Sequence, residues 1–444
     1  MFQILRNAWK ITDLRKKILY TLLIVLIFRV GSAITVPFVD VATLKEAIKD
    51  LTGTGGFMDY LTMISGGGFS NASIFALSIT PYINASIIVQ LLTVAIPKWE
   101  EWAKEGEAGR KKLGTVTRFM TVALGLLLGI AYYFMLRSNA NFGNVLVKEA
   151  QKGFGAWFAA VVIVLCFVAG SALVMWLGEQ INDKGIGNGI SILLFAGILS
   201  GIPAAARRLW AWFYDGGIAM LGKSPDAIKN IILVPIVLII FLAIIAFIVF
   251  ITDAERRIPV QYAKRVVGRK MYGGQNTFIP IKVNMSGVMP IILASSIVSL
   301  PSILGSFFNW KSNWFLNAFR QDSWVYIILY FVLIIGFAFF YVTIQYNPTE
   351  MANNLRKNSG AIPGYRPGQP TSDYIKRVLN KVTLIGALFL GFIALFPSLF
   401  GMISGFYGLT LGGTSVMIVV GVALETTQQI ESQMMMRHYK GFLE

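Results

Sequence analysis

The stretch "PYINASIIV" at residues 81–89 has a counterpart in "PIILASSIV" at residues 290–298, 209 positions further along the chain. A proline, an Ala-Ser pair, two isoleucines and a valine recur in register, and Ile83 matches Ile292. Both stretches lie within apolar runs long enough to cross a bilayer as helices. The match therefore indicates an internal repeat within a membrane-spanning chain.

The composition agrees with a membrane protein. Of the 444 residues, 55% are hydrophobic and only 14% are charged, and the mean hydropathy is +0.65. Soluble globular chains carry about 25% charged residues, so no soluble core could bury this excess of apolar surface. The single cysteine, Cys166, excludes a disulfide framework and any cysteine metal cluster. The single histidine, His438, excludes most zinc sites and histidine-based catalysis.

Apolar runs of span length predict ten transmembrane helices. They lie near residues 18–36, 72–96, 115–136, 154–178, 186–206, 230–252, 286–306, 323–346, 378–400 and 408–428. With the N-terminus in the cytoplasm, most lysines and arginines fall in cytoplasmic segments, as the positive-inside rule requires. We therefore expect both termini in the cytoplasm. The net charge of +17 is then largely a topology signal, although many of the basic residues gather in two long cytoplasmic loops.

The repeat predicts how the spans are arranged. Spans 2 and 7 are five crossings apart, so they run in opposite directions through the membrane. The predicted fold is an all-α polytopic membrane protein of ten helices in two inverted five-helix halves around a central pore. The expected segments are an interfacial N-terminal helix (1–17), the N-terminal half (18–206), an outer loop (207–229), the C-terminal half (230–428, with cytoplasmic loops 253–285 and 347–377) and a cytoplasmic tail (429–444).

A secondary transporter for a small solute is the first alternative that inverted halves suggest. Ion-coupled transporters usually place ionisable groups at mid-membrane, and this chain has few. Arg118, Lys381 and Glu425 sit near span ends, where long side chains reach the interface. Arg29 lies inside the first span, and the sequence offers no account of it. The small-solute alternative is weakened.

An enzyme is also disfavoured. Ser404 in "GMISGF" (401–406) resembles a membrane serine motif but has no histidine within the bilayer to activate it. "GIGNG" at 185–189 follows no strand and lacks the Lys-Ser/Thr of a phosphate loop, so it predicts a tight bend that opens span 5. We expect no covalent chemistry and no cofactor.

A passive pathway lined by apolar side chains remains. Ile79 and Ile83 lie four apart on one face of span 2, and Ile186 and Ile190 have the same spacing at the start of span 5. Most isoleucines in such spans contact lipid or neighbouring helices. A ring of them would nevertheless form a constriction that excludes water and ions yet can close around a larger chain.

Five motifs resemble the SecY family of bacterial protein-translocation channels. They are "ASIFALSITPYINASIIVQLLTV" (72–94), "GIGNGISILLFAGI" (185–198), "VNMSGVMPIILASSIV" (283–298), "IPGYRPGQPT" (362–371) and "GGTSVMIVV" (412–420). The likeness runs from Arg15 to about Glu431. It implies a channel in the bacterial cytoplasmic membrane that translocates unfolded secretory polypeptides and releases signal or membrane segments sideways into lipid.

The resemblance also implies a plug and a pore ring. The plug would be residues 57–68, a short outer helix on a glycine hinge, since glycine adopts backbone angles closed to other residues. Its members would be Phe57, Met58, Tyr60, Leu61, Met63, Ile64, Gly66, Gly67 and Gly68. The pore ring would consist of Ile79, Ile83, Ile186, Ile190, Ile292 and Ile418.

A lateral gate between spans 2 and 7 follows from the same resemblance. Polar side chains of the two spans should face each other or the pore, because lipid exposure would be costly. They are Thr80, Asn84 and Gln90 on span 2 and Ser295, Ser296 and Ser299 on span 7. Ordinary helix-to-helix bonding is an equally good role for them.

The two basic loops are the expected docking surface for a motor or ribosome. Short β-prone runs around "YGGQ" (272–275) predict a protruding hairpin in the first loop. The docking residues would be Arg256, Arg257, Lys264, Arg265, Arg269, Lys270, Arg356, Lys357 and Arg366, which could pair with acidic protein or with ribosomal RNA phosphates. The partners implied are the membrane subunits SecE and SecG, the SecA motor ATPase, the translating ribosome, secretory preproteins with their signal peptides, and lipid.

Overall fold

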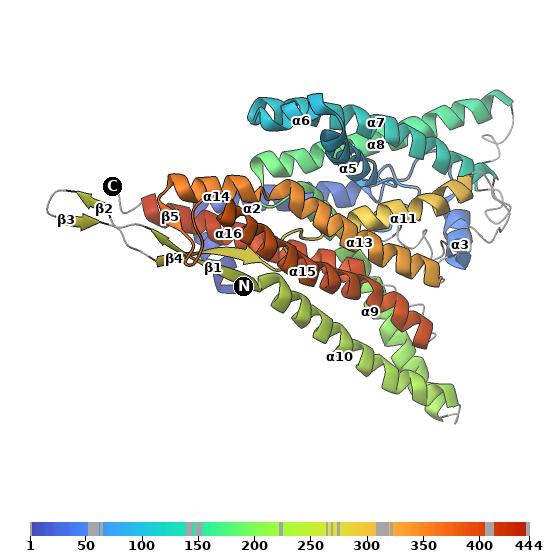
Figure 1. The fold of residues 1–444 in the computed structure, drawn as a ribbon. Helices are drawn as coiled ribbons and strands as arrows, with labels where there is room; N and C mark the ends of the chain where they lie inside the picture. Colours follow the sequence, from blue (N-terminus) through green and yellow to red (C-terminus); the bar gives the residue numbers. More distant parts are fainter. Residues whose placement is uncertain are drawn as a thin grey trace.

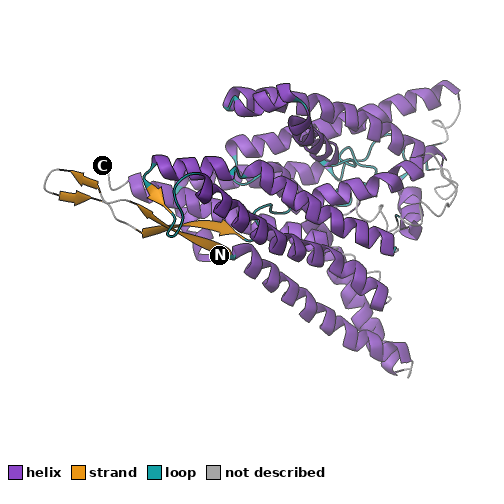
Figure 2. Cartoon of the chain, in the orientation of Figure 1, coloured by secondary structure: helices purple, strands orange, loops and turns teal. Residues whose placement is uncertain are grey.

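A bundle of long helices carrying a small β-structure at one end makes up the chain (Figures 1 and 2). The computed structural model describes residues 2–51, 62, 65–138, 145–147, 153–221, 225–262, 265–267, 270–272, 276–307, 319, 323–404 and 413–440. Most of these residues are helical, as the sequence predicts.

The described helices of the first half of the chain include five on which the first five expected spans fall, together with three shorter helices. Their bounds are α1 Phe2–Lys10, α2 Thr12–Gly31, α3 Val41–Leu51, α5 Thr80–Ala95, α6 Pro97–Lys104, α7 Glu107–Ser138, α8 Gly153–Lys184 and α9 Gly189–Leu221. Neighbours in sequence pack together, with α5 against α7, α7 against α8 and α8 against α9.

The described helices of the second half include five on which the other five expected spans fall, together with one short helix in the expected loop 347–377. Their bounds are α10 Pro225–Asp253, α11 Met289–Phe307, α13 Trp324–Gln345, α14 Pro348–Lys357, α15 Gln369–Ser404 and α16 Gly413–Lys440. Helix α16 joins the two halves, because it packs on α1 and α9 as well as on α10 and α15.

Apolar helices long enough to cross a membrane are present. Within the described residues, four stretches qualify: Glu107–Arg137, Phe154–Lys184, Trp324–Lys357 and Gln369–Phe396. A fifth is formed by α5 and α6 if their bend of 104° belongs to one span. Three shorter apolar helical stretches are Gly189–Ala204, Leu238–Asp253 and Met289–Val298. The protein is thus a mostly helical membrane protein, whereas ten spans in two inverted halves stay a prediction.

Residues 65–79, which precede α5, form successive turns, so the expectation of a helix from residue 72 is wrong. Gly66, Gly67, Ala72 and Ser78 all have positive φ, which no α-helix contains. Helix α5 begins only at Thr80, with proline in its first turn, where proline is favoured. Hydropathy could not reveal this, because the irregular stretch is as apolar as the helix that follows it.

The irregular backbone finds its hydrogen bonds within the protein. The amide of Ile74 donates to the carbonyl of Ile34 over 2.9 Å, and the amide of Val36 donates to that of Ala72 over 2.9 Å. The hydroxyl of Tyr132 donates to the carbonyl of Phe69 over 2.7 Å. Non-helical backbone at membrane depth is tolerated only where it is buried in protein or lines a cavity, and these bonds meet the first condition.

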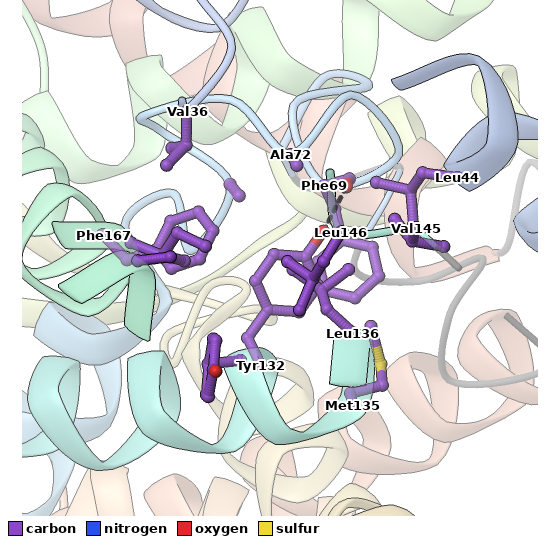
Figure 3. Close-up of a cluster of buried hydrophobic side chains, with 14 residues drawn as sticks. Val36, Leu44, Phe69, Ala72, Tyr132, Met135, Leu136, Val145, Leu146 and Phe167 are labelled. Atoms are coloured by element: carbon purple, nitrogen blue, oxygen red, sulfur yellow. Dashed lines mark hydrogen bonds between the residues drawn. The ribbon is translucent and has the colours of Figure 1, made fainter. Parts of the chain in front are cut away.

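A cluster of buried side chains surrounds this segment (Figure 3). The ring of Tyr132 on α7 lies between Phe69 and Phe167 on α8, with centroids 4.6 and 4.9 Å away. Leu44 on α3 and Val145 also belong to the cluster, and both are fully buried. Three helices therefore hold the irregular segment in place.

The β-structure brings the two long loops together. Strands β1 Glu255–Tyr262 and β4 Asn276–Lys282 pair antiparallel, and β5 Gly360–Ala361 from the second loop pairs with the end of β1. The sheet order is β4-β1-β5. Strands β2 Arg265–Val267 and β3 Lys270–Tyr272 form a hairpin that projects from the helices (Figure 1). A protruding hairpin is thus present in the first loop, but its two strands both come before residue 273, so it is not formed by the runs on either side of "YGGQ" (272–275) as expected.

Candidate functional site

Five of the six isoleucines expected to form the ring belong to one hydrophobic cluster. Ile79, Ile83 and Ile418 are buried in it, and Ile190 and Ile292 are half-buried against it. They come from the junction before α5 and from α5, α9, α11 and α16, which lie far apart in sequence. The fold thus brings together aliphatic side chains from both halves of the chain.

Local structure sets the direction of these side chains. Ile79 precedes the first residue of α5, and its carbonyl accepts a hydrogen bond from the amide of Ile83 over 3.0 Å. The two side chains therefore lie one helical turn apart on the same face, as the spacing predicts.

Ile186 lies elsewhere. Helix α9 begins only at Gly189, where the side chain of Asn188 accepts from the amide of Ile190 over 3.1 Å and so caps the helix. Gly187 has a φ of +85°, and the turn it makes separates Ile186 from the helix. The expected bend at 185–189 is confirmed, but the expectation that Ile186 and Ile190 share a helix face is wrong. Ile186 packs with Ala8, Leu14 and Ile430 instead.

Further buried side chains share the cluster with the five isoleucines and were missed by the sequence analysis. Val422 on α16 lies four residues after Ile418, and Ile192 lies two after Ile190. Helical spacing from Ile418 could have indicated Val422. Ile192 has no counterpart in the repeat, so nothing in the sequence distinguished it from an apolar residue that only packs against its neighbours.

The polar residues expected at a gate lie on two helices that both pack against α7, namely α5 and α11. Thr80, Asn84 and Gln90 on α5 are half-buried. The side-chain oxygen of Asn84 is buried without a hydrogen-bond partner among the described residues. Ser295 is buried, Ser296 is half-buried, and the Ser295 hydroxyl donates to the carbonyl of Ile292 over 2.9 Å. The side chain of Ser299 lies outside the described residues.

The three glycines of the expected hinge are described, whereas the short helix expected before them is not. Phe57, Met58, Tyr60, Leu61, Met63 and Ile64 lie outside the described residues. Gly66 and Gly67 have positive φ, of 62° and 85°. The amide of Gly68 donates to the carbonyl of Ser65 over 3.1 Å, so residues 65–68 form a tight turn.

The basic residues of the two loops gather on the β-structure and the helix next to it. Arg256 and Arg257 lie on β1, and Arg356 and Lys357 end α14; with Arg366 they are all exposed. The Arg257 guanidinium bonds Glu255 over 2.6 Å and lies 4.7 Å from the centre of the Phe278 ring. Arg265 and Lys270 lie on the hairpin strands, while Lys264 and Arg269 lie outside the described residues.

A hydrogen-bond chain fastens this β-structure to α16. Lys282 at the end of β4 donates to the side-chain oxygen of Gln428 over 2.6 Å. The Gln428 amide donates in turn to Asp253 at the end of α10 over 3.1 Å. Gln428 therefore connects the loop that carries the basic residues to the helix that carries Ile418. Nothing in the sequence pattern set Gln428 apart.

The site is a cluster of aliphatic side chains next to the irregular segment that ends at Ile79. Aliphatic constrictions dewet and so block ions. The exposed arginines at the strand-bearing end suit a partner with acidic groups or phosphates.

Comparison with solved structures identifies the fold. The fold matches a SecY structure that describes how a plug domain stabilises the closed state of the translocation channel, with a TM-score of 0.63 and 18% identity over 94% of this chain and 92% of that one. It also matches Sec61 from a canine ribosome-channel complex of the endoplasmic reticulum, with a TM-score of 0.57 and 15% identity over the same shares. The fold is that of a translocation channel.

Sequence comparison gives the family. Residues 73–427 match the SecY family. The "Protein translocase subunit SecY" of Streptomyces galbus is 44% identical over 445 residues, which covers 98% of each chain. The chain therefore belongs to the SecY family. Its relatives are channel subunits and not enzymes, and nothing among them supports a transporter of small solutes.

Proposed function

We propose that this chain is the protein-conducting channel of a bacterial plasma membrane, through which unfolded secretory polypeptides pass. The observation that carries the proposal is the convergence of Ile79, Ile83, Ile190, Ile292 and Ile418 in one cluster. A narrow ring of aliphatic side chains holds back ions while no chain is present. Its side chains have no fixed polar partner, so the ring can part for any polypeptide sequence.

Ten spans in two inverted halves are part of this proposal. The repeat supports it, because α5 and α11 begin at equivalent positions, with Pro81 and Pro290 each the second helical residue. The helix α16, which packs on elements of both halves, would complete the pore wall. Ile186 is left out of the constriction, because it packs toward α1 and α2 with Ala8 and Leu14. Both termini would be cytoplasmic, on the side of the β-structure.

A plug and a lateral gate complete the channel. Residues 57–64 would close the outer side on the hinge Gly66, Gly67 and Gly68. Signal and membrane segments would leave between α5 and α11. Thr80, Asn84 and Gln90 on α5 and Ser296 on α11 are half-buried there, and Ser295 is buried. Half-buried polar side chains support a contact that can be remade, because each can exchange a protein partner for water at modest cost.

The energy source would be a partner on the cytoplasmic side. Five exposed basic residues lie on the sheet or next to it, which supports a shared docking surface. They are Arg256, Arg257, Arg356, Lys357 and Arg366. SecA or a translating ribosome would dock there, and SecE and SecG would be the membrane subunits. A relative of the fold is itself a ribosome-bound channel.

Reconstitution tests the proposal. The purified chain with SecE and SecG, in liposomes of bacterial lipid, should import a secretory precursor only when SecA and ATP are both added. The matched control carries Ile418→Asp, which would place a charge in the apolar cluster. Saturable uptake of a small solute without SecA, and no import of precursor with it, would overturn the proposal.

A further inference from the structure

Gln428 on α16 lies between two charged side chains at the two ends of the first basic loop. Lys282 at the end of β4 donates to its Oε1 over 2.6 Å, and its Nε2 donates to Asp253 at the end of α10 over 3.1 Å. An ammonium group can only donate, and an ionised carboxylate can only accept. The two neighbours therefore fix the orientation of the Gln428 amide, which accepts on one side and donates on the other.

The two ends of the loop form one body, which we call the loop root: residues 253–255 and 282–283. Glu255 on β1 pairs with Lys282 on β4, and the amide of Val283 donates to the carbonyl of Ala254 over 2.9 Å. Helix α15 packs directly against the carbonyl of Val283 at Gly386, where a side chain would have no room. The loop root therefore holds together without Gln428.

Helix α16 is held in the bundle by apolar contacts of its own. Met417 shares a buried cluster with Ile248 of α10, and Ile430 packs against α1 and α2. A Cβ atom at Gly421 would lie 2.9 Å from the side chain of Val288, which precedes α11. Apolar contacts are not directional, and helices packed in this way can slide past one another by small amounts. They keep α16 in the bundle without tying it to the loop root.

Gln428 supplies the directional link between α16 and the loop root. In the part of the chain that the structure describes, its two bonds are the hydrogen bonds that join the helix to the root. Helix α16 continues without a proline from Gln428 back to Ile418, a separation of about 15 Å at the helical rise. Because a continuous helix moves as a unit, a shift of the loop root that pulls on Gln428 also shifts Ile418.

We propose that Gln428 is a positioning residue that couples the docking surface to the constriction. A partner docked on the basic loops displaces the loop root, and Gln428 passes the displacement to α16, which moves Ile418 within the isoleucine cluster. The inference rests on the docking surface and the constriction of the proposed function. Loss of the two Gln428 bonds leaves α16 in the bundle but uncouples it from the loop root.

Maleimide labelling of Ile418→Cys reports on this coupling. The variant is made in a Cys166→Ser background of the full channel complex in liposomes, and labelling is timed with and without SecA and a non-hydrolysable ATP analogue. Docking should raise the labelling rate of this parent. Gln428→Leu removes both bonds at similar size and should reduce that increase about two- to tenfold, the range for losing a hydrogen bond of ordinary strength. Gln429→Leu changes an exposed neighbour and should respond like the parent.

Charge variants test the two bonds separately and also serve if Gln428→Leu does not assemble. Gln428→Glu can accept from Lys282 but repels Asp253, whereas Gln428→Lys can donate to Asp253 but repels Lys282. Both should lose the docking response. Combining Gln428→Lys with Lys282→Glu lets the new ammonium donate to two carboxylates and should restore the response. Such a recovery is non-additive, and a simple disturbance of α16 would not produce it, so a double variant as unresponsive as Gln428→Lys would contradict the coupling.

Import of a secretory precursor separates the coupling from docking and from the proposed function. Gln428→Leu should lower the maximal import rate while the SecA concentration at half-maximal rate stays unchanged. A raised half-maximal concentration with an unchanged maximal rate would mean that Gln428 only shapes the docking surface, and would overturn the coupling. If the parent imports precursor and Gln428→Leu equals it in import and in labelling, the coupling alone is wrong. If the parent imports nothing with SecA and ATP, the proposed function itself fails.

Discussion

Replacing Gly170 by alanine should displace the irregular segment that leads to the constriction. Gly170 lies on α8, and a Cβ atom there would sit 1.9 Å from the carbonyl oxygen of Ile74 and 2.9 Å from its Cγ2. Real Cβ atoms do not approach closer than 3.0 Å, so the two backbones must separate by about 1 Å. Overpacking of this kind costs about 1–3 kcal/mol.

The amide of the same residue, Ile74, donates a hydrogen bond to the carbonyl of Ile34, so the displacement also strains this backbone hydrogen bond. For a chain of this size, we expect the thermal midpoint of the detergent-purified complex to fall by about 1–4 °C. Gly336→Ala on α13 is the matched control, because a Cβ there would meet nothing within 4 Å. It should be neutral or slightly stabilising, by at most about 1 kcal/mol. An unchanged midpoint for Gly170→Ala would refute the close approach of α8 to the segment.

Three further variants test the Gly66 turn, the basic docking surface and the isoleucine cluster. Gly66→Ala should raise the resting ion conductance more than Gly67→Ala. Both positions have positive φ, but only at Gly66 would the added Cβ lie within 3.2 Å of neighbouring atoms. Equal conductances would show that the turn does not fit tightly between α2 and α9. Arg366→Glu should slow SecA-driven export about fivefold or more through like-charge repulsion with an acidic partner, with little effect on membrane insertion, whereas Arg377→Glu should slow it less. Ile418→Asn should raise conductance in planar bilayers. An amide buried in an apolar constriction without a hydrogen-bond partner costs about 1–3 kcal/mol, so water enters to bond it. Tight sealing by this variant would show that Ile418 is not part of the barrier.

Apolar runs predicted where the long helices lie, but not the short helices α3, α6 and α14, because hydropathy reports only which residues avoid water. They could not predict where α5 begins. Residues 72–79 are as apolar as α5 itself, yet Ala72 and Ser78 have positive φ, and the carbonyls of Ala72 and Phe69 bond the amide of Val36 and the hydroxyl of Tyr132. Tertiary hydrogen bonds replace the helical ones there, and no local pattern encodes them.

The candidate constriction was predictable only in part. The repeat paired Ile83 with Ile292, and both contribute to one cluster. Ile186 was expected beside Ile190 because the spacing of four suits a helix, but the Asn188 cap starts the helix after Ile186. Spacing predicts a shared face only inside a helix, and the cap decides where the helix is.

Long-range polar contacts lay beyond sequence analysis altogether. Arg29 found its partner in the carbonyl of Gly66, an atom that every residue possesses and that no motif marks. Pairing between Tyr262 and Gly360, which joins the two basic loops, depends on backbone groups in the same way. Charge clustering indicated that these loops have a partner, but only the structure shows them sharing a sheet.

Crosslinking of a translocating chain tests the central claim most directly. A cysteine is placed at Ile83 or at Ile292 in a Cys166→Ser background, and a secretory precursor with a bulky folded end is stalled during SecA-driven translocation into inverted vesicles. The account predicts adducts between the precursor and both positions, and none when ATP is withheld. A demonstrably stalled precursor that forms no adduct at either position would mean that the polypeptide passes elsewhere, and would contradict the assignment of the isoleucine cluster as the constriction.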